Sequence, residues 1–222
     1  MSSGPFAVSW SGGKDSTLAL DRALRNGMDV RWLFNLYDGQ TGRVRFHGVR
    51  TELIELQADR LGLELVHKAT SPADFEAVFL DALDALVDAG ANGIIFGNIH
   101  LADVRGWYEE RTTAAGLQHV EPLWGDAPES LVAEVLHRGY RARITGVDLS
   151  RGSRDWPGRE LDRALAAEIA ARPDTDPAGE HGEYHTYVFD GPLFGTPVDV
   201  VVGASHEAEG HLLVDLTERQ VT

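Results

Sequence analysis

The sequence predicts an α/β protein with a doubly wound parallel sheet and a smaller α+β part after it. Short apolar strands alternate with helical segments between residues 6 and 115, and this alternation is typical of parallel strands joined by right-handed helical crossovers. After residue 125 the alternation stops, and the last part of the chain reads as consecutive strands. We therefore expect two domains, at residues 1–125 and 126–222.

Apolar periodicity and turn residues define the elements of the first part. Residues 6–10 form an apolar run that ends in a Ser-Gly-Gly turn, and a helical pattern follows it. Residues 31–37 indicate a buried strand, closed by the turn at Asp38-Gly39. The later elements are a helix at 51–61, a strand at 64–67, a helix at 73–89, a strand at 93–97 and a helix at 103–115.

The second part begins with a helix and a strand and ends in β-structure. Its expected elements are a helix at 129–137, a strand at 141–147, a helix at 161–171, and strands at 184–189, 198–203 and 211–216. The segment 172–179 carries two prolines and is expected to be a linker. This part is too small and irregular to repeat the first, so we expect it to have a separate role.

Composition limits the classes of function to consider. The chain of 222 residues carries 35 acidic and 20 basic side chains, and its net charge of −15 disfavours binding to nucleic acid or to anionic membranes. It has no cysteine, which excludes thiolate zinc sites, iron–sulfur clusters and a cysteine nucleophile. No apolar run approaches the ~18 residues of a membrane span, so we expect a cytoplasmic protein.

The run SGGKDS at residues 11–16 joins the first strand to the first helix. Two glycines allow the backbone to approach a ligand, and the free N–H groups and the dipole of the helix start attract an anion. Ser11, Ser16 and Lys14 add hydrogen-bond donors, and Asp15 suits a magnesium ion shared with a phosphate. The pattern therefore predicts a phosphate site.

Two alternatives to this interpretation are weaker. A Walker A loop would need Gly at position 8 and Ser or Thr at position 15, but the chain has Val8 and Asp15 there. A plain glycine turn with one capping side chain would not need the full run of donors. In a parallel sheet the loops after residues 10, 37 and 97 also meet at one edge, which is where ligands bind.

At this point the chain resembles the PP-loop ATP pyrophosphatases, whose signature is SGGxDS, and among them the diphthine–ammonia ligase family and its bacterial relatives. Besides residues 11–16, three segments carry the resemblance: 97–124, with R-x3-E, GL and PLW elements, 158–162, and 179–194, which is similar to a GENGE…T…DGP block. Asn98 and His181 depart from the family pattern, which has Asp and Asn at these positions.

The resemblance implies an adenine nucleotide α-hydrolase (HUP-like) fold and an ATP-dependent ligase. An acceptor carboxylate would be adenylated with release of pyrophosphate, and ammonia would then displace AMP. ATP and Mg²⁺ are the implied cofactors, and the acceptor is implied to be diphthine on a translation elongation factor. Because the chain has no cysteine, ammonia must be free or come from a partner. The oligomeric state is open, and a homodimer is one alternative.

The resemblance also assigns site residues. Lys14, Asp15 and Glu183 are the catalytic candidates, and Asp15 is the candidate magnesium ligand. The ATP-binding candidates are Ser11, Gly12, Gly13, Lys14, Asp15, Ser16, Asn35, Gly97, Arg105 and Glu109. The acceptor-binding candidates are Glu180, His181, Glu183, His185 and Thr186.

Alternatives remain for the second site and for the function. If residues from 180 onward are extended, His181, Glu183 and His185 share one strand face, which would also suit a metal ion. We favour acceptor recognition over this metal site and over a polar hairpin. For the whole chain, the alternatives are an ATP- or AMP-binding sensor without turnover, which Asn98 keeps open, and a PP-loop tRNA-modifying enzyme, which the charge disfavours.

Overall fold

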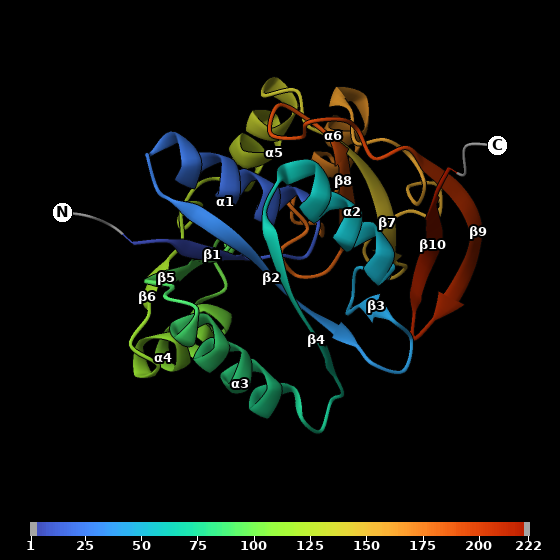
Figure 1. Cartoon of the computed structure of the whole chain (residues 1–222). Coiled ribbons are helices and arrows are strands. Elements are labelled where there is room, and N and C mark those ends of the chain that lie inside the picture. The colour runs from blue at the N-terminus through green and yellow to red at the C-terminus, as the bar shows by residue number, and fades with distance from the viewer. Residues whose placement is uncertain (1–3, 220–222) are drawn as a thin grey trace.

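The first part of the chain forms an open, mostly parallel sheet between two layers of helices (Figure 1). The computed structural model describes residues 4–219. The elements of this part are β1 (Phe6–Ser9), α1 (Lys14–Arg25), β2 (Val30–Asp38), β3 (Arg43–Val44), α2 (Thr51–Leu61), β4 (Glu64–Thr70), α3 (Phe75–Asp88), β5 (Gly93–Ile95), α4 (Ala102–Ala114) and β6 (Gln118–Val120).

The parallel strands lie in the order β4-β2-β1-β5-β6, and the short β3 pairs with the end of β2 in the antiparallel sense. The chain moves from β1 toward β4 and then crosses back to β5 on the other side of β1. The order therefore reverses between β1 and β5, and such a switch point is where doubly wound sheets bind ligands. The predicted doubly wound α/β class is confirmed.

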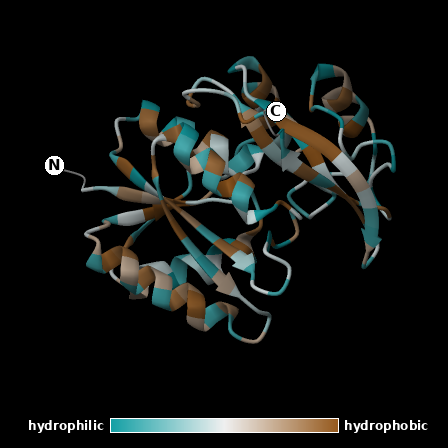
Figure 2. Cartoon of the chain, turned by 45° about the vertical axis from the view of Figure 1, so that its right-hand side comes forward, coloured by the Kyte–Doolittle hydropathy of each residue, from teal (hydrophilic) through white to brown (hydrophobic). Residues whose placement is uncertain are grey.

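Alternating strand residues fill two separate cores, one on each face of the sheet. Figure 2 shows hydrophobic residues, in brown, along the central strands and a mixture of brown and teal along the helices. Val8 and Leu33 belong to the cluster that contains residues of α1 and α2, whereas their neighbours Ala7 and Phe34 belong to the cluster that contains residues of α3. This follows from the period of two in a strand, where successive side chains point to opposite faces.

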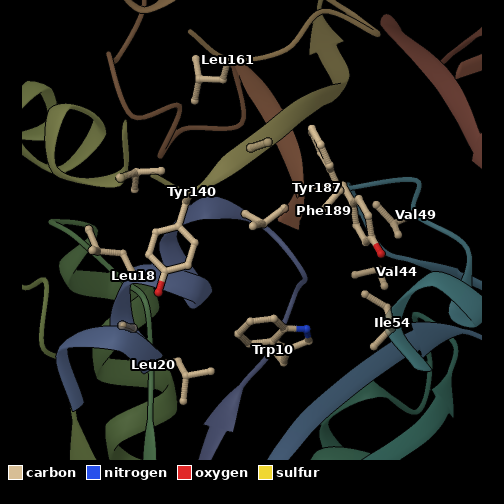
Figure 3. Close-up of a cluster of buried hydrophobic side chains, with 14 of the residues drawn as sticks. Trp10, Leu18, Leu20, Val44, Val49, Ile54, Tyr140, Leu161, Tyr187 and Phe189 are labelled. Atoms are coloured by element: carbon tan, nitrogen blue, oxygen red, sulfur yellow. The ribbon is translucent and has the colours of Figure 1, made fainter. Parts of the chain in front are cut away.

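The second part forms an antiparallel sheet of strand order β8-β7-β10-β9. Its elements are α5 (Pro128–His137), β7 (Arg141–Asp148), α6 (Arg163–Ala170), β8 (Tyr184–Asp190), β9 (Val200–Ala208) and β10 (His211–Glu218). This sheet packs on the α1 and α2 side of the parallel sheet, and one buried cluster contains residues of both. Figure 3 shows this shared cluster, with Trp10, Leu18 and Ile54 from the first part and Tyr140, Leu161, Tyr187 and Phe189 from the second.

The structure departs most from the predicted elements at the strands β3, β4, β6, β8 and β9, and β9 runs from Val200 to Ala208 rather than over residues 198–203. The strands β3 and β6 were not predicted, because they have two and three residues and β6 begins with the polar pair Gln118-His119. The strand β4 runs to Thr70 rather than to residue 67. The strand β8 begins at Tyr184, so residues 180–183 form turns instead of the extended segment considered above.

Within residues 4–219, none of the helices combines the length and the apolar character needed to cross a lipid bilayer.

Candidate functional site

A cavity of about 570 Å³ opens at the carboxyl ends of β1, β2 and β5, beside the switch point. The loop after β1, the end of β2, the loop after β5 and the start of β8 all contribute to its lining. Its volume lies within the range of ~300–1,000 Å³ that is usual for small-molecule sites. The cavity therefore lies where the sequence predicted a ligand.

The loop between β1 and α1 needs glycine at position 12. Gly12 has a φ of +78°, and a Cβ atom there would lie 2.7 Å from the Gln57 side-chain oxygen. Gly97 meets the same loop from β5, since a Cβ at this position would lie 2.9 Å from the carbonyl carbon of Asp15. Larger side chains at either position would push the loop out of place.

The first turn of α1 lies at the cavity, where Lys14, Asp15 and Ser16 form part of the lining. Gly13 is the N-cap and supplies no side chain, so the N–H groups of Asp15 and Ser16 have no partner inside the helix. The hydroxyl oxygens of Ser11 and Ser16 lie 3.4 Å apart, and both residues line the cavity. With the helix dipole, these donors form an arrangement that suits an anion, at the loop where the sequence predicted a phosphate site.

The second sheet supports this loop from behind. The Val188 N–H donates to the Gly12 carbonyl at 2.9 Å, and the Lys14 N–H donates to the Thr186 hydroxyl at 3.0 Å. The buried amide of Gln57 donates to both the Gly12 and Val188 carbonyls. Thr186, predicted to bind the acceptor, thus holds the loop between β1 and α1 through its side chain, although it also lines the cavity.

The ammonium group of Lys14 is occupied by protein groups. Its Nζ lies 2.9 Å from the Asp15 carboxylate, donates to the Ala178 carbonyl and lies 4.9 Å from the centre of the Tyr184 ring. Burial is the largest influence on the pKa of Lys14 and would lower it. The charge and hydrogen bond of Asp15, together with the charges of Tyr184 and Glu180, outweigh burial and raise the pKa above its ordinary value. Lys14 is therefore a fixed positive charge in the floor of the cavity.

Two carboxyl groups from distant parts of the chain, Asp15 and Glu180, line the cavity. Glu180 Oε1 accepts the Ile99 N–H at 2.9 Å. Burial raises the pKa of both groups, and the charge of Asp15 raises that of Glu180 further. Carboxylates in this situation gain from a bound cation, and oxygen ligands suit Mg²⁺, so these two residues fit the implied magnesium ion.

The other end of the cavity is apolar and suits a planar base. Its wall consists of the aromatic residues Phe34, Phe79, Phe96 and Tyr108. Asn35, predicted to lie near adenine, donates to the Trp10 carbonyl at 2.6 Å, while its buried Oδ1 atom has no hydrogen-bond partner among the described residues. The sequence indicated Asn35 but not the aromatic wall, because α3 and α4 residues give only an ordinary core pattern.

Arg105 and Glu109 lie outside the lining of the cavity. They form an ion pair at 3.4 Å on α4, and Arg105 also lies 3.3 Å from the buried Glu121 carboxylate. Asn98 does line the cavity, and its Nδ2 atom donates to Glu121 Oε1 at 2.8 Å. Arg105 and Asn98 thus contact the same Glu121 carboxylate, but Asn98 lines the cavity and Arg105 does not.

Glu183 also lies outside the cavity lining. Its buried carboxylate accepts the N–H of Asp176 and the N–H of His181, each at 3.0 Å. The predicted face of His181, Glu183 and His185 does not form, because only His185 lies in β8. Glu183 shapes the preceding loop, His181 is exposed, and neither is directed at the cavity.

His185 lines the cavity beside His47, with 4.6 Å between the two ring centres. His47 Nδ1 lies 3.3 Å from the Thr186 carbonyl. Burial lowers the pKa of His47 to about 4 and the pKa of His185 well below its ordinary value, so both imidazoles are neutral at pH 7. They offer hydrogen-bonding nitrogen atoms without adding charge.

Two family models match the chain. The model described as "Diphthamide synthase N-terminal domain" matches residues 4–119, and the model described as "Diphthamide synthase C-terminal domain" matches residues 127–218. No curated protein matches the sequence.

Proposed function

Because the chain belongs to the diphthamide synthase family, we propose that it is an ATP-dependent ligase that converts an acceptor carboxylate to an amide. The observation that carries this proposal is the junction of β1 and α1. There, free N–H groups and hydroxyls face the same cavity as two carboxyl groups, Asp15 and Glu180. This pairing suits a phosphate chain and the metal ion that accompanies it.

The proposed position of ATP follows from the two ends of the cavity. The adenine lies against the aromatic wall, beside Asn35 of β2. The phosphates lie at the start of α1, where the N–H groups of Asp15 and Ser16 donate to them. Asp15 and Glu180 would hold Mg²⁺, which offsets the charge of the departing pyrophosphate.

The proposed reaction has two steps. An oxygen of the acceptor carboxylate attacks the α-phosphorus of ATP, and the bond to the β-phosphate oxygen breaks to release pyrophosphate. Ammonia then attacks the carbonyl carbon of the acyl-adenylate, AMP leaves with the electron pair of the broken C–O bond, and the nitrogen loses a proton. The fixed charge of Lys14 and the N–H groups of α1 stabilise the negative charge that develops on the phosphates.

The acceptor is proposed to enter beside β8. Glu180, His185 and Thr186 line the cavity there, next to the phosphate loop. A diphthine-like acceptor carries a trimethylammonium group, and the neutral imidazole of His185 can lie against this group without repelling its charge. Ammonia comes from solution or from a partner protein, since the chain has no cysteine to release it from glutamine.

The test is to incubate the protein with ATP, Mg²⁺, ammonia and a diphthine-bearing elongation factor, and to measure AMP and pyrophosphate. We expect both products, and we expect the Asp15→Asn variant to form AMP at least ~100-fold more slowly. Asp84→Asn, on the exposed face of α3, is the matched control and should retain full activity. ATP binding without AMP under any condition would contradict the ligase and support the sensor alternative.

A further inference from the structure

A cluster of metal-ligating side chains lies beside the cavity. Among the described residues, His100, Asp176 and His181 each offer one ligand atom, and these atoms all lie within 4.8 Å of one another. His100 Nε2 and Asp176 Oδ2 are 3.2 Å apart, and the rings of His100 and His181 have their centres 5.4 Å apart. His100 follows β5, whereas the other two residues precede β8.

The backbone around two of these residues is fixed by Glu183. Its buried carboxylate accepts the N–H groups of Asp176 and His181, so one side chain sets the position of both. Asp176 Oδ1 accepts the Ala178 N–H at 2.7 Å, which leaves Oδ2 directed at His100. The carboxylate is thus oriented before any ion binds, and hydrogen bonds that orient a ligand in this way strengthen metal binding in known sites.

We propose that His100, Asp176 and His181 bind a zinc ion. Two imidazoles and one carboxylate are a usual donor set for zinc, with a water molecule as the fourth ligand. Ligand atoms in a tetrahedral zinc site lie ~3.3 Å apart, so the cluster must close by at most ~1.5 Å from its present spread. His100 and His181 are exposed and can turn to do so, whereas Asp176 is already fixed.

Zinc at this position would join the two parts of the chain at the rim of the cavity. It would connect the loop after β5 to the loop before β8. The hydrogen bond from the Ile99 N–H to Glu180 already connects the same two loops. The site is separate from the magnesium position proposed above, because it shares no ligand with it. Zinc binding is measured without ATP, so the result of this test does not depend on whether the protein is a ligase.

The test is isothermal titration calorimetry of the full chain with ZnCl₂, after treatment with a chelator and without nucleotide. We expect one ion per chain, and we expect His181→Ala and His100→Ala each to weaken binding by roughly tenfold or more. His206→Ala, an exposed histidine on β9, is the matched control and should bind zinc as the unaltered protein does. Zinc should also raise the midpoint of thermal unfolding, and this rise should vanish in His181→Ala.

Three results would overturn the site. The first is no heat with zinc in the unaltered protein. The second is equal binding by His181→Ala and the His206→Ala control, which would show that other histidines hold the ion. The third is binding that survives in His181→Ala but is lost in Asp15→Asn, which would show that zinc occupies the carboxylates of the cavity. Visible absorption of the Co²⁺-loaded protein gives a second readout, since a tetrahedral site and a hydrated ion differ in colour.

Discussion

Glu183 shows how one residue can be identified by its sequence context and still have a different role. Its place in the GENGE-like block pointed to the acceptor, and the structure places its carboxylate on two backbone N–H groups. Such a carboxylate can accept at both oxygens, whereas a glutamine side chain has an NH₂ donor at one of these positions. The contact partners lie in a loop, and sequence patterns do not fix loop geometry.

We therefore expect Glu183→Gln to lower the free energy of unfolding by about 1–3 kcal/mol, because one buried N–H loses its acceptor. Urea unfolding of the two proteins measures this difference. Glu110→Gln is the control, since the Glu110 side chain is 81% exposed and its loss should change stability little. If Glu183→Gln left the free energy of unfolding unchanged but greatly reduced the use of the acceptor, this result would contradict the structural role and support a role for Glu183 in substrate binding.

Among the contacts between elements, the contact of β8 with the start of α1 matters most for the site, because it supports the loop at the cavity. Val188 and Thr186 bind the loop backbone, so the second sheet holds the phosphate loop in its shape. The sequence predicted both the loop and the strand, because each has a strong local pattern. It could not predict that they meet, because Lys14 and Thr186 are 172 residues apart and no local pattern records such a contact.

We expect Thr186→Val to weaken ATP binding by roughly tenfold, because the Lys14 N–H loses its acceptor and the loop loses its support. Valine matches threonine in shape, so the core around β8 should be retained. Calorimetric titration with ATP and Mg²⁺ measures the effect, with Thr217→Val on β10 as the control. Equal affinity in the two variants would mean that the loop keeps its shape without β8.

The neighbouring residues His47, in the loop between β3 and α2, and His185, on β8, predict that the stability of the fold depends on pH. His47 and His185 are neutral in the fold, but the unfolded chain takes up protons near pH 6.5. Between pH 6.5 and about 4, the unfolded state binds more protons than the folded state, so stability rises with pH and falls on acidification. Thermal unfolding of the protein and of His185→Gln from pH 7 to 4 checks this. The variant should lose less stability, and a parallel loss would contradict the assignment.

At the scale of the whole molecule, the two parts share one core. The same buried cluster contains Leu18 and Ile54 from the parallel sheet and Tyr187 and Phe189 from the antiparallel one. Asp215 on β10 also pairs with Arg43 and Arg50, whose hydrogen bonds and charges lower the pKa of Asp215 to about 2. We propose that residues 1–125 and 126–222 are distinct in sequence pattern but not in stability.

We therefore expect the chain to unfold in a single cooperative transition. Separate domains with their own cores would unfold independently, whereas a shared core couples them. Differential scanning calorimetry measures this through the ratio of calorimetric to van't Hoff enthalpy, which should be close to one. Two resolved transitions would show that the parts are independently stable.

The fold could be predicted further than the site. Strong apolar runs such as residues 31–37 and 93–97 determine the strands, and their alternation with helices predicts that they run parallel, although the order of the strands came only from the structure. Ser11 and Asp15 were predicted because glycine-rich anion loops are local. The aromatic wall, the Thr186 contact and the position of His181 depend on how distant segments pack, which periodicity does not record.

We propose above all that the start of α1 binds the phosphates of a nucleotide. Calorimetric titration of the full chain with ATP in the presence of Mg²⁺ measures this binding. We expect heat with one site per chain, and weaker binding in Asp15→Asn but not in Asp84→Asn. The absence of heat with any adenine nucleotide and divalent cation would contradict the claim.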